Sequence, residues 1–275
     1  MPFLDRPGGV RIFWDQGGKE DGPPILLIRG LSRSSSYWLG LRPLLEKEHR
    51  VVVLDNRGVG QSSAVRPGFT VQDMADDCAA VLRQVGACHV FGISLGGMVA
   101  QHLALRHPAF VRTLTLAATT FGGRERKPVP PWVIASFLRT ATMSTEQMMR
   151  FTAPITLDPE FVRARPDVVD AWVKIAVGEP RNGWALLGQL LAAARHDASK
   201  DVSSLKMPVM IVVGDRDRLI PPENSTQLHQ RIPGSEMVTL PGLAHDFPTE
   251  APEKVADVIA SFVSKHASQI VMRRL

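Results

Sequence analysis

Short, unbroken runs of apolar residues recur along the chain, and segments with helical periodicity separate them. Runs of this kind suit parallel strands that are covered on both faces. The predicted strands are Val10–Trp14, Ile25–Ile28, Val51–Leu54, Val90–Ile93, Leu114–Ala117, Val209–Val213 and Met237–Leu240. Because strands that alternate with helices form right-handed βαβ units, the pattern predicts an α/β protein with a mostly parallel sheet flanked by helices.

The segment that follows Phe69 has the pattern of an amphipathic helix. Thr70 is the predicted N-cap, and Asp73 stands three residues later in the capping-box position. Gly86 is a natural stop. The apolar stripe of this helix consists of Met74, Cys78, Val81, Leu82 and Val85. Further helices are expected at Gly96–His107, Pro222–Arg231 and Pro252–His266.

The alternation of strands and helices is interrupted between Phe121 and Ser204. This stretch is rich in helix-forming residues, Trp and Met, is cut by several prolines and contains no convincing strand. We expect a core domain formed by residues 1–120 and 205–275, with residues 121–204 forming a helical cap over the ends of the strands. The alternative interpretation is a second, independent helical domain.

Composition excludes several classes of protein. The 275 residues are 44% hydrophobic and 21% charged, as in an ordinary globular protein. The net charge of +5 comes from scattered Lys and Arg, so we expect no nucleic-acid partner. No run of 18 apolar residues occurs, which predicts no membrane partner. The sequence carries no indication of an oligomeric state.

Two cysteines, Cys78 and Cys88, bear on the cellular compartment. Cys78 falls on the apolar face of the predicted helix, which favours two reduced thiols in a cytoplasmic protein. The N-terminus has no basic segment followed by an apolar stretch, so no signal peptide is expected. Metal-ligand spacings such as CxxC and HExxH do not occur, and neither a metal nor a cofactor is expected.

The sharpest chemical signal is the G-x-S-x-G pattern centred on Ser94. It lies between a predicted strand and a predicted helix, which is the context that a nucleophile elbow requires. The turn crowds the backbone around Ser94, so that only small residues fit at Gly92 and Gly96. The pattern therefore predicts a serine nucleophile at the carboxyl end of a strand.

A serine hydroxyl needs a base within hydrogen-bond reach, and the base needs an orienting acid. His245 follows the last predicted strand directly and so lies at the same sheet edge as Ser94. Both Asp215 and Asp217 follow the strand before it. We favour Asp217, which is further into its loop and better placed to reach His245, whereas Asp215 is expected to shape the turn.

These residues resemble the α/β-hydrolase family, and the resemblance covers nearly the whole chain. The matching stretches are Gly92-x-Ser94-x-Gly96-Gly97, Gly214-x-x-Asp217-x-x-x-Pro221, Gly242-x-x-His245 and Asp55–Ser62. We interpret the last of these as a structural turn whose glycines adopt positive φ. The matches are more similar to small lidded serine esterases and enol-lactone hydrolases than to lipases.

The resemblance implies an oxyanion hole and also marks one departure from the family. The backbone N–H groups of Leu31 and Leu95 are the implied donors. The family usually carries His-Gly before the first donor, whereas this chain has Arg29-Gly30. The Arg29 side chain either makes a structural ion pair and hydrogen bonds to loop carbonyls, or it binds a negative or polar group of the substrate.

Together, these features predict a serine hydrolase that cleaves small-molecule carboxylic esters or lactones through Ser94, His245 and Asp217. Apolar residues of the expected cap are candidates for the substrate pocket, namely Trp132, Phe137, Met148 and Trp184. Two alternatives remain open. One is a C–C bond hydrolase of the same fold, and the other is a non-catalytic small-molecule binding protein on the same scaffold.

Overall fold

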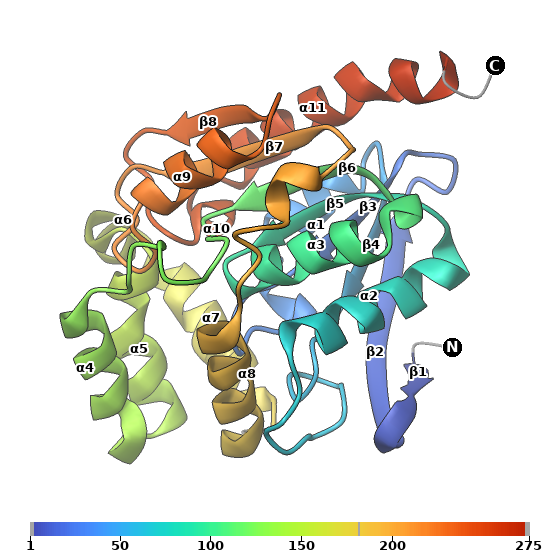
Figure 1. The fold of residues 1–275 in the computed structure, drawn as a ribbon. Helices are drawn as coiled ribbons and strands as arrows, with labels where there is room; N and C mark the ends of the chain where they lie inside the picture. The colour runs from blue at the N-terminus through green and yellow to red at the C-terminus, as the bar shows by residue number, and fades with distance from the viewer. Residues whose placement is uncertain (1–2, 181, 273–275) are drawn as a thin grey trace.

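Eight strands form one sheet in the order β1-β2-β4-β3-β5-β6-β7-β8 (Figure 1). The computed structural model describes residues 3–180 and 182–272. The strands are β1 (Phe3–Arg6), β2 (Val10–Gly18), β3 (Pro24–Ile28), β4 (Arg50–Leu54), β5 (Cys88–Ile93), β6 (Val111–Ala117), β7 (Val209–Gly214) and β8 (Glu236–Leu240). β2 is antiparallel to both of its neighbours, and all other neighbouring strands are parallel. The predicted α/β class with a mostly parallel sheet is confirmed.

The amino-terminal edge of the sheet differs from the prediction. β1 was not predicted, because it has only four residues, two of them charged, and the pattern carries no signal for so short a strand. β2 runs on to Gly18 through a polar stretch, since it pairs with β1 at its start and with β4 at its end. Pairing with neighbouring strands, rather than apolar content, sets the length of β2.

Helices cover both faces of the sheet. They are α1 (Leu41–Leu45), α2 (Val71–Val85), α3 (Leu95–Arg106), α4 (Pro131–Arg139), α5 (Thr145–Thr156), α6 (Pro159–Ala164), α7 (Pro166–Gly178), α8 (Gly183–Arg195), α9 (Glu223–Arg231), α10 (Phe247–Glu250) and α11 (Pro252–Met272). Short 3₁₀ turns occur at Pro7–Gly9, Ser35–Tyr37, Pro108–Phe110, Thr140–Thr142 and Val202–Ser204. No helix within the described residues is long and apolar enough to cross a membrane.

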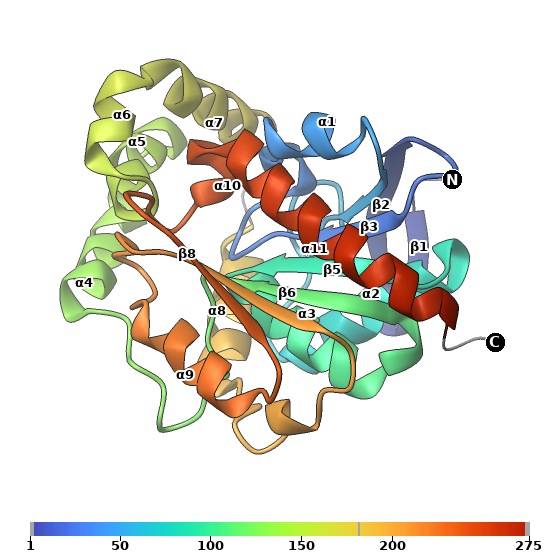
Figure 2. The same ribbon diagram turned by 90° about the horizontal axis from the view of Figure 1, so that it is seen from above.

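Side chains alternate between the two faces of each central strand and so build two cores. Leu26 and Ile28 of β3 pack with α2 and α3, whereas Ile25 and Leu27 pack with α1 and α11. Figure 2 shows α1 and α11 on one side of the sheet and α2, α3 and α9 on the other. The sheet is therefore covered on both faces, as its unbroken apolar runs predict.

Helix α2 has the boundaries that its sequence predicts. Thr70 and Asp73 form a reciprocal capping box, and Gly86 ends the helix with a φ of 94°. Cys78 on the apolar stripe is buried, and neither it nor Cys88 forms a disulfide. Burial raises the pKa of Cys88 to about 12 and raises that of Cys78 as well, so both thiols are protonated at neutral pH.

Helices α4–α8 lie between β6 and β7 in the chain, and we refer to them as the helical insert. Figure 1 shows these helices together, apart from the helices that cover the faces of the sheet. Between β6 and β7, the described residues form no strand, and an isolated bridge joins Gly122 and Asp197 on either side of the insert. The predicted run of helices in this segment is thus present.

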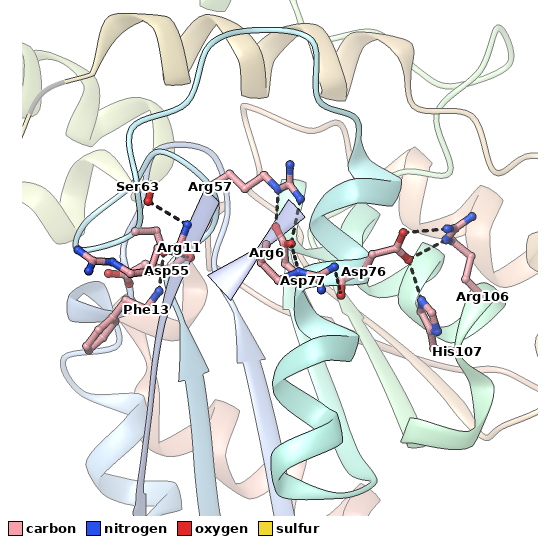
Figure 3. A network of polar contacts seen from close by, with 11 residues as sticks. Arg6, Arg11, Phe13, Asp55, Arg57, Ser63, Asp76, Asp77, Arg106 and His107 are labelled. Atoms are coloured by element: carbon pink, nitrogen blue, oxygen red, sulfur yellow. Dashed lines mark hydrogen bonds and ion pairs between the residues drawn. The ribbon is translucent and has the colours of Figure 1, made fainter. Parts of the chain in front are cut away.

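The Asp55–Ser62 stretch is a turn with positive-φ glycines, as expected, and the structure adds that the Asp55 carboxylate holds it. Asp55 accepts hydrogen bonds from the backbone N–H groups of Ser35 and Gln61 at 2.7 and 2.9 Å. Gly58 and Gly60 have φ values of 78° and 54°. Figure 3 shows the neighbouring ion pairs, in which Asp77 of α2 accepts from both Arg57 and Arg6.

Candidate active site

The backbone around Ser94 is a sharp turn between β5 and α3. Ser94 has φ 58° and ψ −123°, which is rare for a residue with a side chain. A Cβ added at Gly92 would lie 2.3 Å from the carbonyl oxygen of Gly96, and one added at Gly96 would lie 2.2 Å from that of Ile28. The two glycines are therefore required by crowding, as the sequence pattern indicates, and the serine side chain stays partly accessible.

His245 and Asp217 meet in loops that follow neighbouring strands. His245 comes after β8, Asp217 comes after β7, and the His245 Nδ1 atom lies 2.8 Å from Oδ2 of Asp217. Both side chains are buried. The other carboxylate oxygen of Asp217 accepts from the N–H groups of Leu219 and Ile220, each at 2.9 Å. These bonds hold the carboxylate in one orientation towards the imidazole.

Asp215 has a different environment from Asp217. Its side chain is exposed, and its Oδ1 accepts a 2.7 Å hydrogen bond from the N–H of Gly242. This bond ties the loop after β7 to the loop that carries His245. The structure thus brings Asp217, and not Asp215, to the imidazole.

Two influences of opposite sign act on the pKa of His245. Burial lowers it, because a charged imidazolium loses its hydration, but the Asp217 carboxylate and its hydrogen bond favour the charged form. The carboxylate prevails, and the pKa of His245 lies above the ordinary value of 6.5. This environment suits a base that must hold a proton briefly and then return it.

The loop after β3 packs directly against Ser94. A Cβ added at Gly30 would lie 3.0 Å from Cβ of Ser94 and 3.5 Å from its Oγ. Within the described residues, no hydrogen bond uses the N–H of Leu31 or that of Leu95. Ser94, Leu95 and the Gly30–Leu31 segment therefore occupy one corner at the carboxyl ends of β3 and β5.

Arg29 has its partners inside the protein. It is 1% exposed, and its guanidinium donates to Asp246 at 3.0 Å and to the Tyr37 carbonyl at 2.7 Å. It also lies over the Trp38 ring, 4.3 Å from the centroid. Burial raises the pKa of Asp246, but Arg29, with smaller contributions from Arg33 and His245, outweighs burial and holds that pKa below its ordinary value. These contacts favour the structural interpretation of Arg29 over substrate binding.

The four candidate pocket residues of the insert are spread over three helices. Trp132 and Phe137 of α4 are 44% and 38% exposed, and Trp184 of α8 is 66% exposed. Met148 of α5 is partly buried against a cluster that contains Tyr37 and Trp172. Their contact with substrate stays a prediction.

Two side chains that the sequence analysis did not single out join the insert to the loop after β3. Gln189 of α8 is fully buried and hydrogen-bonds two loops. The Arg33 guanidinium lies over the rings of Tyr37 and Trp172 at 4.4 and 4.3 Å. A charged residue in an otherwise small and polar loop could have indicated Arg33. Nothing in the sequence distinguishes Gln189 from any other helical glutamine.

No group of three or more His, Cys, Asp or Glu side chains within the described residues could hold a metal ion. The groups that the sequence prediction and the structure place at the strand ends are a hydroxyl, an imidazole, a carboxylate and backbone N–H groups. This set is sufficient for nucleophilic acyl transfer.

Comparison with known proteins agrees with the fold. A family model described as the alpha/beta hydrolase fold matches residues 23–252. The pimeloyl-[acyl-carrier protein] methyl ester esterase of Aeromonas hydrophila is 30% identical over 247 residues, which cover 88% of this chain and 96% of the relative. The putative carbamate hydrolase RutD of Escherichia coli K12 is 29% identical over 246 residues, covering 85% of this chain and 88% of the relative.

Among solved structures, a thermophilic esterase from Thermogutta terrifontis, determined with malate bound, superposes with a TM-score of 0.81. It is 26% identical, and the alignment covers 96% of this chain and 97% of that one. The chain belongs to the alpha/beta hydrolase fold family. The relatives identify it, more specifically, as a hydrolase.

Proposed function

We propose that this protein is a serine hydrolase of small-molecule carboxylic esters or lactones, with Ser94 as nucleophile, His245 as base and Asp217 as orienting acid. The observation that carries the proposal is the 2.8 Å contact between His245 and Asp217 at the sheet edge where Ser94 forms the elbow. The relatives named as a methyl ester esterase and an esterase support the ester bond as the target.

The proposed reaction proceeds through an acyl-enzyme. The Ser94 hydroxyl transfers its proton to Nε2 of His245 as its oxygen attacks the substrate carbonyl. The backbone N–H groups of Leu31 and Leu95 donate to the oxyanion that forms. His245 then protonates the departing alkoxide, and the alcohol leaves. Water repeats these steps on the acyl-enzyme and releases the acid, so that the enzyme returns to its starting state.

Asp217 acts on the imidazole rather than on the substrate. It accepts a hydrogen bond from the Nδ1–H of His245, which leaves Nε2 free to receive the serine proton. It also stabilises the imidazolium that exists while the proton is held. The helical insert is proposed to cover the site as a cap and to supply apolar surface for the acyl group.

A fluorophosphonate probe and a Ser94→Ala variant test this proposal. We expect rapid labelling of the wild type at Ser94 and ester hydrolysis that the variant loses by about 10⁴-fold or more, since triad residues act as a unit. The variant should melt at nearly the same temperature as the wild type. Ser203→Ala, which removes an exposed hydroxyl, is the matched control and should keep full activity.

The choice of substrates makes the test discriminating. The panel contains p-nitrophenyl esters, lactones and vinylogous diketones, the last of which report C–C bond hydrolysis. Faster turnover of the diketones than of any ester or lactone would replace the proposal with the C–C reaction. If the probe does not label Ser94 and no substrate is turned over, the proposed hydrolase function is replaced by a small-molecule binding function.

A further inference from the structure

The side chain of Gln189 bridges the loop after β3, which packs against Ser94, and the turn after β4. It belongs to α8 of the insert and is 0% exposed. Its Oε1 accepts a 2.8 Å hydrogen bond from the N–H of Ser32, and its Nε2 donates a 3.0 Å bond to the carbonyl of Arg57. Because one neighbour is a donor and the other an acceptor, only one orientation of the amide satisfies both.

The bond to Ser32 falls beside one of the two expected oxyanion donors. Ser32 directly follows Leu31 and has a φ of 51°, a conformation that a serine adopts only when its surroundings hold it. On the other side of Leu31, the carbonyl of Arg29 accepts a 3.0 Å bond from Nδ2 of Asn56. The Gly30–Leu31 segment is therefore fixed between two side-chain hydrogen bonds, one of which comes from the insert.

Helix α8 packs closely against the turn after β4 and against Phe69, which favours a rigid bridge at Gln189. A Cβ added at Gly58 would lie 2.1 Å from Cβ of Ala185, one turn of α8 before Gln189. A Cβ added at Gly188 would lie 2.5 Å from the Phe69 ring. There is no room for a side chain at either glycine, so α8 packs closely against the turn that contains Arg57 and against Phe69.

We propose that Gln189 is a positioning residue that holds the Leu31 N–H in the direction of the oxyanion and so makes the oxyanion hole depend on the docked insert. The inference rests on the function proposed above. Gln189 does not touch the reacting atoms. It acts through the Ser32 peptide, whose orientation sets the path of the chain on the far side of Leu31.

Gln189→Met tests the proposal, because it keeps the length and burial of the side chain and removes both hydrogen bonds. A misplaced donor stabilises the transition state less while it leaves substrate binding intact. We expect kcat for p-nitrophenyl butyrate to fall by about tenfold to a hundredfold, somewhat less than the loss of a whole oxyanion donor, and KM to change by less than about twofold.

Inhibition by a trifluoromethyl ketone distinguishes a positioning role of Gln189 from a general structural role, because a merely structural role would leave the Ki of the ketone unchanged. The ketone forms a tetrahedral adduct with the serine, whose oxygen occupies the oxyanion position. Its Ki should rise in Gln189→Met by the same factor as kcat falls. An unchanged Ki alongside a reduced kcat, or a kcat within about twofold of the wild type, overturns the proposal.

Gln101→Met is the matched control. Gln101 of α3 is also a fully buried glutamine, and its Nε2 donates to the carbonyls of Thr120 and Gly97 at 3.0 and 3.3 Å. Within the described residues, its side chain makes no hydrogen bond to the loop after β3. We expect a loss of melting temperature similar to that of Gln189→Met with an unchanged Ki for the ketone. A Ki that rises equally in both variants overturns the proposal, because the effect is then general loosening.

Amide hydrogen exchange separates this inference from the proposed function. If the Ser32 N–H exchanges faster in Gln189→Met than in Gln101→Met, the positioning contact exists whether or not the wild type turns over esters. Equal exchange of the Ser32 N–H in the two variants would show that Gln189 does not hold the Ser32 peptide.

Should Gln189→Met fail to fold, Gln189→Glu keeps the acceptor for Ser32 and loses the donor to Arg57. The Ser32 N–H of Gln189→Glu is then expected to exchange as slowly as in the wild type, and faster exchange counts against the inference.

Discussion

The imidazole of His245 is the group through which pH should control the reaction. Only its neutral form accepts the serine proton, and its pKa lies above 6.5 because the Asp217 carboxylate prevails over burial. We therefore expect kcat/KM for a neutral ester to rise with pH and to reach its half-maximum above pH 6.5. The measurement is a kcat/KM profile between about pH 5 and 9.

Substitution of Asp217 tests whether its carboxylate sets the pH dependence of kcat/KM. Asp217→Asn removes the negative charge and favours the wrong imidazole tautomer, so kcat should fall by about 10⁴-fold and the half-maximum should move to lower pH. Within the described residues, the Asp215 side chain hydrogen-bonds only the N–H of Gly242, so Asp215→Asn should act mainly on stability. The reverse ranking of these two variants would assign the acid to Asp215.

Substitution of Arg29 should affect stability rather than substrate binding, because its guanidinium pairs with Asp246 and the Tyr37 carbonyl inside the protein. Arg29→Met leaves the buried Asp246 carboxylate unpaired, which costs about 3 kcal/mol of unfolding free energy in comparable cases. Urea denaturation measures this loss. Anionic and neutral esters of equal size should then be affected alike. A KM that rises about tenfold for the anionic ester alone would show that Arg29 binds substrate instead.

At the scale of elements, one buried carboxylate of α2 joins this helix to β1 and to the turn after β4. Asp77 is 1% exposed and accepts hydrogen bonds from Arg6 of β1 and from Arg57 of the turn after β4 (Figure 3). Asp77→Asn should lower the unfolding free energy by about 3 kcal/mol, because two guanidinium groups lose their shared partner. Chemical denaturation of the variant checks this value.

The neighbouring residue provides the control for Asp77. Asp76 makes comparable contacts with Arg106 and His107, but its side chain is 30% exposed. Water screens such pairs, so Asp76→Asn should cost less than about 1 kcal/mol. Equal losses in the two variants would mean that burial is not what sets the strength of these ion pairs.

Elements with a local signal were predictable from the sequence. The box of Thr70 and Asp73 marked the start of α2, and the crowding around Ser94 marked the elbow between β5 and α3. β1 was missed because its pairing partner, and not its own four residues, makes it a strand.

Contacts between distant segments were not predictable in the same way. Asp246, the partner of Arg29, lies 217 residues further along the chain, and Gln189 bonds to Ser32 across 157 residues. Periodicity, caps and turns describe neighbours in the sequence and contain no information on such pairs. Only the three-dimensional packing of the loops reveals them.

Considered as a whole, the molecule attaches its insert to several strand-end loops. Gln189 bonds to the loop after β3, while the carbonyl of Thr156, at the end of α5, accepts a 2.8 Å bond from the N–H of Asp246. Glu250 bonds to the N–H groups of both Asp158 and Ala244, and so joins α6 to the loop before His245. The insert is thus anchored on both the nucleophile side and the base side of the sheet edge.

The backbone at this sheet edge stores conformational energy. Within the described residues, the non-glycine positions with positive φ are Ser32, Ser94 and Ala118, and each follows the carboxyl end of a parallel strand. Each costs on the order of 1–3 kcal/mol, and the arrangement persists only while the surrounding contacts enforce it. Warming that loosens those contacts should let the edge relax before the cores melt. We expect ester hydrolysis to be lost reversibly a few degrees below the unfolding midpoint measured by circular dichroism, whereas coincident transitions would show that the edge and the cores melt as one unit.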